Sequence, residues 1–223
     1  MSYQHQLLGH DDCNLPVGKV VCVGRNYAEH ARELNNPVPS EPILFIKPAT
    51  AIVDMQQPIG IPTDYGSCHV ETEMALLIGK EVRKESPAEA LEAVAGVGLG
   101  FDLTLRDLQS KLKDKGHPWE KAKAFDGSCP LSAFAPTAAM QWDNVDLTLT
   151  RNGKLQQSGN SSDMLTGVGD LLSYISRFFT LQPGDVVLTG TPAGVGPLSP
   201  GDELIATLND QLSVTTEVVG VCF

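Results

Sequence analysis

The chain has 223 residues, a length typical of one large domain with a sizeable core. Its 16 Lys and Arg residues against 27 Asp and Glu residues give a formal net charge of −11, which excludes nucleic acid as a partner because phosphate binding needs a basic stripe. Every apolar run is far shorter than the roughly 20 residues of a membrane span, so no membrane partner is expected either.

The cysteines and the first residues indicate the compartment. Five cysteines stand at positions 13, 22, 68, 129 and 222, an odd number without CxxC spacing, which favours free thiols in a reducing compartment. Residues 1–20 lack a basic segment followed by an apolar one, and no arginine precedes Arg25. Neither a secretory signal nor a transit peptide is therefore indicated, and we expect a cytoplasmic protein.

The first predicted elements are a strand and a helix. Residues 19–24 are an apolar run closed by glycine, which predicts a buried strand. A helix is expected over residues 25–35, with Asn26 as its N-cap. His30 and Glu33 are three positions apart, so they point the same way and can hydrogen-bond. An ordinary surface pair has the same spacing.

A second buried strand is predicted over residues 43–46, directly before Lys47. A lysine at the end of an apolar strand can lie at the sheet edge with its ammonium in solvent, or it can point at an anion. Both interpretations stay open. Residues 58–67 contain two prolines and the sequence DYGS, and we expect them to form a loop.

Two glutamates mark the next predicted strand, which runs from residues 69–73 into the apolar segment 74–79. Because alternate side chains of a strand share a face, Glu71 and Glu73 should lie side by side. Buried carboxylates this close need a proton or a cation, and oxygen ligands favour a hard ion such as Mg²⁺, Ca²⁺ or Mn²⁺ over Zn²⁺. The solvated face of an antiparallel sheet would have the same pattern.

The middle of the chain supplies a third carboxylate. Residues 87–94 are a short helix candidate, and residues 97–101 form a glycine-rich strand that leads into Asp102. Asp102 lies 29 positions after Glu73 (102 − 73), which is enough for the chain to return to the same sheet.

A leucine stripe then predicts another helix, in which Arg106 and Gln109 share an adjoining face. The basic residues from 111 to 123 would by themselves be a solvated loop. Lys123 differs, because the small and turn-forming residues of 123–130 suggest a close approach to another group.

The second half of the chain is predicted to be rich in strands. Residues 146–150 alternate polar and apolar side chains, and the Asn-Gly pair at 152–153 is typical of a hairpin turn. A helix is expected over residues 168–179, with Phe178 on its core side. The glycines of residues 189–196 free backbone amides to face a ligand.

Five ordered segments together resemble the fumarylacetoacetate hydrolase family, and within it the short acylpyruvate hydrolase branch. They are residues 24–30 (GRNYAEH), 69–80 (HVETEMALLIGK), 100–109 (GFDLTLRDLQ), 119–130 (WEKAKAFDGSCP) and 183–196 (PGDVVLTGTPAGVG). The resemblance implies an N-terminal extension of residues 1–17 and a single catalytic domain of residues 18–223. The implied fold is mainly β with short helices, a β-roll or sandwich of mixed sheets, in a protein that forms a homodimer.

The resemblance also implies roles for individual residues. Glu71, Glu73 and Asp102 match the family's ligands for Mg²⁺ or Mn²⁺. His30 and Glu33 match a catalytic dyad, and Lys123 matches a lysine beside the metal.

Substrate contacts are implied as well. Arg106 and Gln109 match residues that bind the substrate carboxylate, and Gly190 and Thr191 match a loop that holds the substrate. Arg25 and Lys47 complete the candidate substrate-binding residues.

The implied activity is hydrolysis of acylpyruvates, which are 2,4-dioxo acids, to pyruvate and a carboxylate. Glu33 would orient His30, His30 would activate the attacking water, and Lys123 would stabilise the negative charge that develops as the C3–C4 bond breaks. Oxaloacetate decarboxylation and keto–enol isomerisation use the same metal-stabilised enolate and are the alternatives. A β-roll that binds a dicarboxylate without turnover is a further alternative from a different class.

Overall fold

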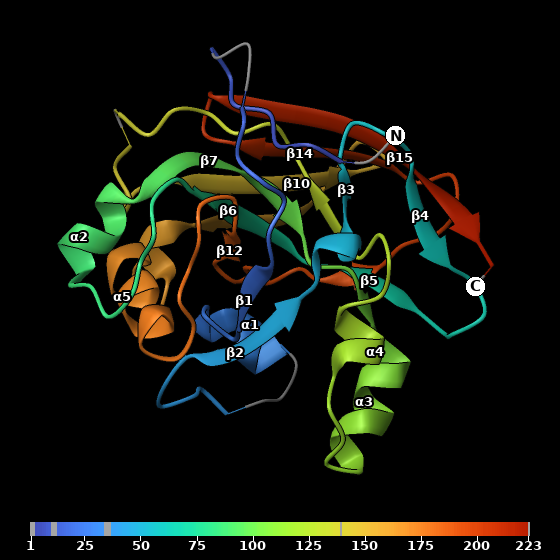
Figure 1. Cartoon of the computed structure of the whole chain (residues 1–223). Coiled ribbons are helices and arrows are strands. Elements are labelled where there is room, and N and C mark those ends of the chain that lie inside the picture. The colour runs from blue at the N-terminus through green and yellow to red at the C-terminus, as the bar shows by residue number, and fades with distance from the viewer. Residues whose placement is uncertain (1–2, 10–12, 34–36, 139, 223) are drawn as a thin grey trace.

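The computed structural model describes residues 3–9, 13–33, 37–138 and 140–222 (Figure 1). Its largest sheet has seven strands in the order β2 (Ile43–Lys47), β1 (Val20–Gly24), β12 (Val186–Leu188), β6 (Thr72–Ile78), β7 (Val94–Phe101), β9 (Cys129–Leu131) and β3 (Ile52–Asp54). The pairs β1–β12 and β3–β9 are parallel and the other neighbours are antiparallel, so the sheet is mixed.

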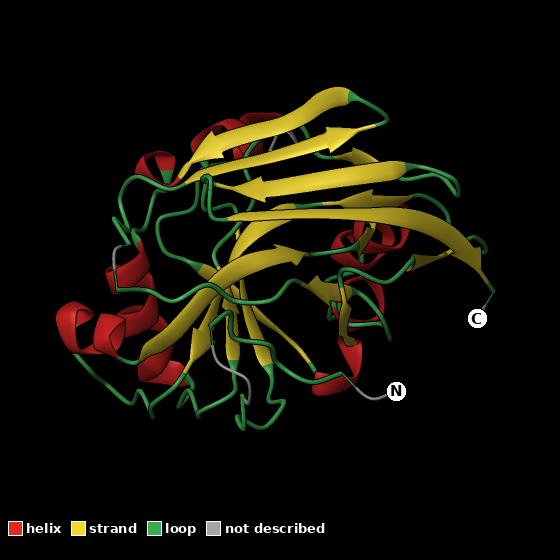
Figure 2. Cartoon of the chain, turned by 90° about the horizontal axis from the view of Figure 1, so that it is seen from above, coloured by secondary structure: helices red, strands yellow, loops and turns green. Residues whose placement is uncertain are grey.

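Two further sheets complete the β structure. One has five strands in the order β11 (Lys154–Asn160), β10 (Asp146–Arg151), β14 (Glu203–Leu208), β15 (Leu212–Val221) and β4 (Ile59–Pro62). The other has three short strands, β13 (Gly196–Pro197), β5 (Cys68–Val70) and β8 (Thr104–Leu105). The five-stranded sheet packs on the seven-stranded one, with β10 against β6 and β14 against β7 (Figure 2).

The helices are short and lie around the sheets. They are α1 (Ala28–Glu33), α2 (Pro87–Glu92), α3 (Arg106–Asp114), α4 (Glu120–Lys123) and α5 (Val168–Phe178), with 3₁₀ turns at Ala49–Ala51 and Ser161–Asp163. Figure 1 shows α2 and α5 together at one end of the molecule and α3 and α4 together at another. Within the described ranges no helix is long and apolar enough to cross a membrane.

Strand β6 is buried on both faces because it separates two hydrophobic cores. Met74, Leu76 and Ile78 pack into the core between the two large sheets, while Ala75 and Leu77 pack into a second core on the other face. This alternation follows from the period of two in an extended strand. The mainly β fold of mixed sheets and short helices is therefore confirmed.

The N-terminal extension predicted for residues 1–17 packs, in its described part, on the second core. Leu7 pairs in parallel with Phe134, and Nε2 of His5 lies 2.9 Å from the carbonyl oxygen of Gly184. The domain boundary at residue 18 stays a prediction.

Three local predictions were wrong. The segment 58–67 was expected to be a loop, but it contains β4, which pairs in parallel with β15. Phe178 was expected in the core, but this last residue of α5 is 63% exposed.

Asn26 was expected to cap the first helix, but its side chain hydrogen-bonds to Thr166 and Thr189 instead. The helix itself is described only over Ala28–Glu33, and the part predicted for residues 34–36 lies outside the described residues.

Candidate metal centre and active site

The three predicted metal ligands come together where two strands end. Strand β5 stops at Val70 and β6 starts at Thr72, so Glu71 lies in a break of the ladder, and Asp102 follows the last residue of β7. The amide of Asp102 donates to the carbonyl of Glu71 at 2.8 Å, which holds the two segments together. One carboxylate oxygen from each of Glu71, Glu73 and Asp102 lies within 4.8 Å of the others, and all three residues are buried.

The electrostatics of this triad favour a cation. Burial raises the pKa of Glu73 well above its usual range, and the negative charges of Asp102 and Glu71 raise it further. The amide of Gly190 donates to Oε2 of Glu73 at 2.6 Å, which acts in the opposite direction without cancelling the rise. The ammonium of Lys47 lies 2.9 Å from Oδ1 of Asp102 and forms a buried ion pair with it. Three buried carboxylates with an oxygen-only donor set fit a hard divalent ion such as Mg²⁺ or Mn²⁺.

Lys123 lies on one side of the triad. Its ammonium is 2.8 Å from Oε2 of Glu71, 2.5 Å from Oδ2 of Asp102 and 2.7 Å from Oγ1 of Thr104. Burial alone would lower the pKa of Lys123, but the negative charges of Asp102 and Glu71 raise it above its usual value. The amine therefore stays protonated at neutral pH, so it can stabilise negative charge but cannot act as a base.

Arg106 lies beside Lys123 and contacts the same ligand. Nη2 of Arg106 donates to Oε1 of Glu71, and Nη1 donates to Oε1 of Gln109 at 2.8 Å. Burial raises the pKa of Glu71, but the charges of Lys123 and Arg106 more than compensate and hold it well below its usual range. Glu71 is therefore ionised.

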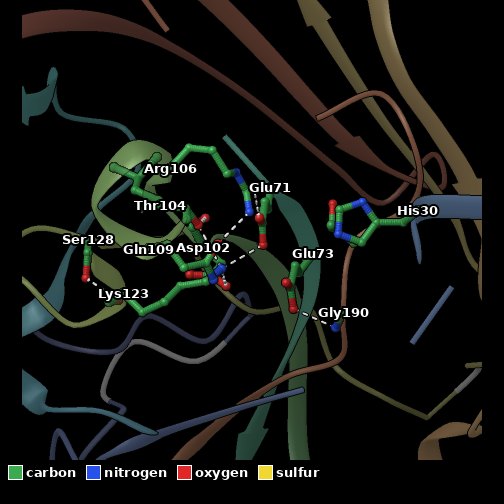
Figure 3. Close-up of polar contacts among 12 residues, drawn as sticks. His30, Glu71, Glu73, Asp102, Thr104, Arg106, Gln109, Lys123, Ser128 and Gly190 are labelled. Atoms are coloured by element: carbon green, nitrogen blue, oxygen red, sulfur yellow. Dashed lines mark hydrogen bonds and ion pairs between the residues drawn. The ribbon is translucent and has the colours of Figure 1, made fainter. Parts of the chain in front are cut away.

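His30 approaches the triad from α1. In the view of Figure 3, His30 lies on the opposite side of Glu71 and Glu73 from Lys123 and Arg106. Nδ1 of His30 is 3.4 Å from Oε2 of Glu33, which also accepts the amide hydrogen of Gly194. Because a carboxylate can only accept, Nδ1 carries the hydrogen and Nε2 is left as the basic nitrogen. Burial lowers the pKa of His30, so the ring is neutral at neutral pH and able to take a proton.

These groups line an open pocket. Of the predicted site residues, its lining includes Arg25, His30, Glu71, Glu73, Arg106, Gln109, Lys123 and Thr191. Glu33 and Asp102 do not line the pocket but contact residues that do.

Lys47 and Gly190 were predicted to bind substrate, but the structure directs both at metal ligands. Lys47 has no exposed surface, is 2.9 Å from Oδ1 of Asp102, and donates to the carbonyl oxygens of Lys123 and Ser128. Neither Lys47 nor Gly190 is among the described residues that line the pocket. The geometry therefore gives the predicted substrate contacts of these two residues no support.

The sequence interpretation missed six residues of the pocket wall, which are Val23, Gly24, Ile43, Phe45, Lys113 and Trp119. Lys113 was included in the basic run that was expected to be a solvated loop. Its spacing from Gln109 and Arg106, four and seven positions, indicates that all three lie on one face of a helix, and that signal was present in the sequence. Trp119 and Phe45 have no comparable local signal.

The fold and the triad define a class of enzyme. A family model described as fumarylacetoacetate (FAA) hydrolase C-terminal matches residues 19–219, and the chain belongs to this family. A solved structure of fumarylpyruvate hydrolase from Pseudomonas aeruginosa, in complex with Mn²⁺ and pyruvate, superimposes with a TM-score of 0.91 and 36% sequence identity. That match covers 97% of this chain and 95% of the other.

Similar proteins of known activity act on oxaloacetate. The chain is 52% identical over 219 residues to oxaloacetate tautomerase YcgM of Escherichia coli K12, covering 97% of this chain and 100% of that protein. It is 43% identical over 200 residues to human mitochondrial oxaloacetate tautomerase FAHD1, covering 89% and 90%. An oxaloacetate decarboxylase of Dictyostelium discoideum is 43% identical over 185 residues, covering 82% and 85%.

Proposed function

We propose that this protein is a metal-dependent enzyme that interconverts the keto and enol forms of oxaloacetate. The observation that carries the proposal is the buried triad of Glu71, Glu73 and Asp102, which lies between a protonated lysine and a neutral histidine. The 52% identity to an oxaloacetate tautomerase supports this alternative over acylpyruvate hydrolysis, which was the first expectation from the sequence.

The chemistry needs a group to move a proton and a group to stabilise an oxyanion. A divalent ion on the triad would act as a Lewis acid that favours the enolate of a 2-oxo acid. His30 takes a proton from C3 of oxaloacetate, with Glu33 fixing its tautomer. Lys123 and Arg106 stabilise the negative charge that moves to the 2-oxo oxygen. Protonation of that oxygen gives the enol, and protonation of C3 returns the keto form.

The test follows the loss of the ultraviolet absorbance of enol-oxaloacetate at neutral pH. We expect acceleration by the metal-loaded protein, none in excess chelator, and a decrease of about 10²-fold or more in the His30→Ala variant because a general base is lost. His117→Ala is the matched control, since His117 is exposed in a loop. If His30→Ala retains the full rate, His30 is not the base. If the metal-loaded wild type gives no acceleration, the proposed activity is wrong.

Acylpyruvate hydrolysis is the second candidate, because the His30–Glu33 pair provides the base that a hydrolytic water needs. The fumarylpyruvate hydrolase neighbour also supports it. Decarboxylation of oxaloacetate is a third outcome of the same site, supported by the Dictyostelium relative. Measuring kcat/KM for enol-oxaloacetate, acetylpyruvate and oxaloacetate decarboxylation on one preparation ranks the three activities. A higher value for acetylpyruvate than for enol-oxaloacetate would favour the hydrolase.

Several finer assignments belong to the same proposal. Mg²⁺ or Mn²⁺ is the proposed ion, and metal analysis of the purified protein tests which is bound. We also propose a homodimer in the cytoplasm, which sedimentation and cell fractionation test. The single catalytic domain of residues 18–223 is tested by expressing that segment alone.

A further inference from the structure

Gln157 is a buried polar side chain that the proposed mechanism does not use. It lies on β11 in the five-stranded sheet and is only 1% exposed. Moving an amide group out of water is unfavourable unless hydrogen bonds within the protein replace those to water. The partners of Gln157 therefore indicate why the fold keeps a polar group at this position.

The hydrogen bonds of Gln157 join two segments of the site. Oε1 of Gln157 accepts the amide hydrogen of Thr72 at 3.0 Å. Nε2 donates to Oγ1 of Thr191 at 2.8 Å and to the carbonyl oxygen of Pro192 at 3.0 Å. Thr72 is the middle residue of the ligand segment, residues 71–73, which contains two of the three proposed metal ligands. Thr191 lines the pocket, so one side chain of the five-stranded sheet connects the ligand segment to a loop of the pocket wall.

These contacts fix the orientation of the Gln157 amide and of the Thr191 hydroxyl. A backbone amide can only donate and a carbonyl can only accept, so the oxygen of Gln157 faces Thr72 and its nitrogen faces Pro192. The hydroxyl of Thr191 must then accept from Gln157, and it donates its one hydrogen to the carbonyl oxygen of Thr72 at 2.8 Å. Toward the pocket, this hydroxyl can therefore only accept a hydrogen bond.

Thr72 needs these side chains because the neighbouring ladder ends before it. Strand β12 pairs with β6 over residues 75–77, so this ladder stops short of Thr72. There Gln157 accepts from the amide of Thr72, and Thr191 donates to its carbonyl. Thr72 has no exposed surface, and a buried backbone group without a partner is costly. The two side chains therefore fix the backbone between the two glutamates of the ligand segment.

The loop that contains Thr191 also reaches Glu33. The amide of Gly194 donates to the Glu33 carboxylate, at 3.0 Å from one oxygen and 3.2 Å from the other. Gly194 has a φ of +96°, and a Cβ there would clash with the carbonyl oxygen of Gln156, so the loop lies directly on β11. Strand β11 thus supports both the ligand segment and the loop that contacts the partner of His30.

We propose that Gln157 is a positioning residue of the metal site. Together with Thr191 it holds the backbone of Thr72, and it thereby sets the separation of the two carboxylates of the ligand segment. Gln157 contacts neither the ion nor the substrate. The inference rests on the metal site of the proposed function, but it does not depend on which reaction that site performs.

The experiment measures the Kd of Mn²⁺ by calorimetry without substrate, at a temperature where circular dichroism shows each metal-free variant to be folded. Gln157→Met keeps the length of the side chain and removes its three hydrogen bonds. We expect the Kd to rise about tenfold or more, as for other residues that orient metal ligands. Gln156→Met is the matched control, because Gln156 is the adjacent residue of β11 and its side-chain amide has no hydrogen bond to the described part of the chain. Its Kd should equal that of the wild type.

Thr191→Val tests the same arrangement from its other side, and it decides alone if Gln157→Met does not fold. It removes the hydroxyl that donates to the carbonyl of Thr72 at 2.8 Å and should also raise the Kd of Mn²⁺. Thr216→Val is its control, since Thr216 is buried on β15 and donates to the carbonyl of Gln57 at the same 2.8 Å. This control should lose stability but not Mn²⁺ affinity. Gln157→Met combined with Thr191→Val should raise the Kd by less than the product of the single effects, because both act on one residue.

Equal Kd values for Gln157→Met and Gln156→Met would overturn the positioning role, and so would equal values for Thr191→Val and Thr216→Val. Single effects that multiply fully in the double variant would overturn the joint action of the two side chains. Because no turnover is measured, these results judge the role of Gln157 even if the tautomerase assay fails. A wild type that binds no Mn²⁺ would contradict the proposed metal site itself, whereas Mn²⁺ binding that is the same in all variants would remove only the role of Gln157.

Discussion

The ammonium of Lys47 lies 2.9 Å from Oδ1 of Asp102, and neither side chain reaches solvent, with exposed fractions of 0% and 1%. Lys47 also donates to the carbonyl oxygens of Lys123 and Ser128. It therefore connects the edge strand β2 to a metal ligand and to the segment that carries Lys123. A lysine that was expected to bind substrate is thus an internal support of the metal centre.

Lys47→Met should destabilise the protein strongly. Removal of one partner from a buried ion pair leaves the other charge without compensation, which costs about 3–5 kcal/mol. We expect this decrease in the free energy of unfolding in urea, measured in chelator. Lys154→Met is the control, because Lys154 is exposed and surface substitutions change stability by about 0.5 kcal/mol or less. A value for Lys47→Met similar to that of the control would contradict the role given to the ion pair.

Gly190→Ala should weaken metal binding. Gly190 has a φ of +96°, and a Cβ there would lie 2.7 Å from Cβ of Asn26, so the loop must shift and move the amide that donates to Glu73. Gly201→Ala is a matched control, since Gly201 has a φ of +91° with no atom near its added Cβ. Both variants incur backbone strain of about 1–3 kcal/mol, but only Gly190→Ala should lose Mn²⁺ affinity in a titration. Equal Mn²⁺ affinities would show that the loop does not position Glu73.

Glu73→Gln should separate metal binding from folding. Glutamine keeps the shape of the side chain and its hydrogen bond from Gly190 but removes one of three crowded charges. In chelator we expect the variant to be at least as stable as the wild type. Saturating Mn²⁺ should raise the unfolding temperature of the wild type alone, because only a protein that binds the ion gains this stabilisation. An equal increase in both proteins would mean that Glu73 is not a ligand.

His5 should contribute to the pH dependence of stability. Its ring is buried beside Phe134, with Nε2 at 2.9 Å from the carbonyl of Gly184 and Nδ1 at 3.3 Å from the hydroxyl of Tyr3. Burial lowers the pKa of His5 below its unfolded value of about 6.5. A histidine held neutral in the fold stabilises it above the unfolded pKa, and this contribution is lost as the pH falls through 6.5 toward the lowered value.

The measurement is the free energy of unfolding of wild type and His5→Gln between pH 7.5 and 5, in chelator. His30 and His69, with pKa values lowered by burial, and Glu73, with a raised pKa, contribute to both curves alike, so the difference between the two curves reports His5. The curve of His5→Gln should fall less steeply, because glutamine does not titrate. His117→Gln, at an exposed position, should follow the wild type. Parallel curves for wild type and His5→Gln would contradict a neutral buried His5.

Strong local patterns predicted most strands and helices. The apolar run before Gly24 became β1, and the Asn152-Gly153 pair formed a hairpin turn in which both residues have positive φ. Strand β4 was not predicted because Pro58 precedes it and Pro62 is its last residue, and its partner β15 lies near the other end of the chain. Pairing over such a separation leaves no local signature.

The candidate site was predictable to different degrees. The spacing of Glu71 and Glu73 indicated a carboxylate pair, but Asp102 joined them only through the family resemblance. The function of Lys47 could not be predicted, because its partner Asp102 is 55 positions away (102 − 47) and an apolar strand followed by lysine fits several structures. The helical face that contains Lys113 was visible, but a cluster of lysines is most often a solvated surface.

The location of β6 has a consequence for how the protein opens. This strand lies between β12 and β7 with packed side chains on both faces, so its amides should exchange hydrogen only when the whole domain unfolds. Glu73 belongs to that strand, whereas His30 belongs to a short helix outside the sheets. Local fluctuations of this helix would therefore displace the proposed base while Glu73, a proposed ligand, stays in place, so the proposed site could come apart and reassemble without loss of its ion.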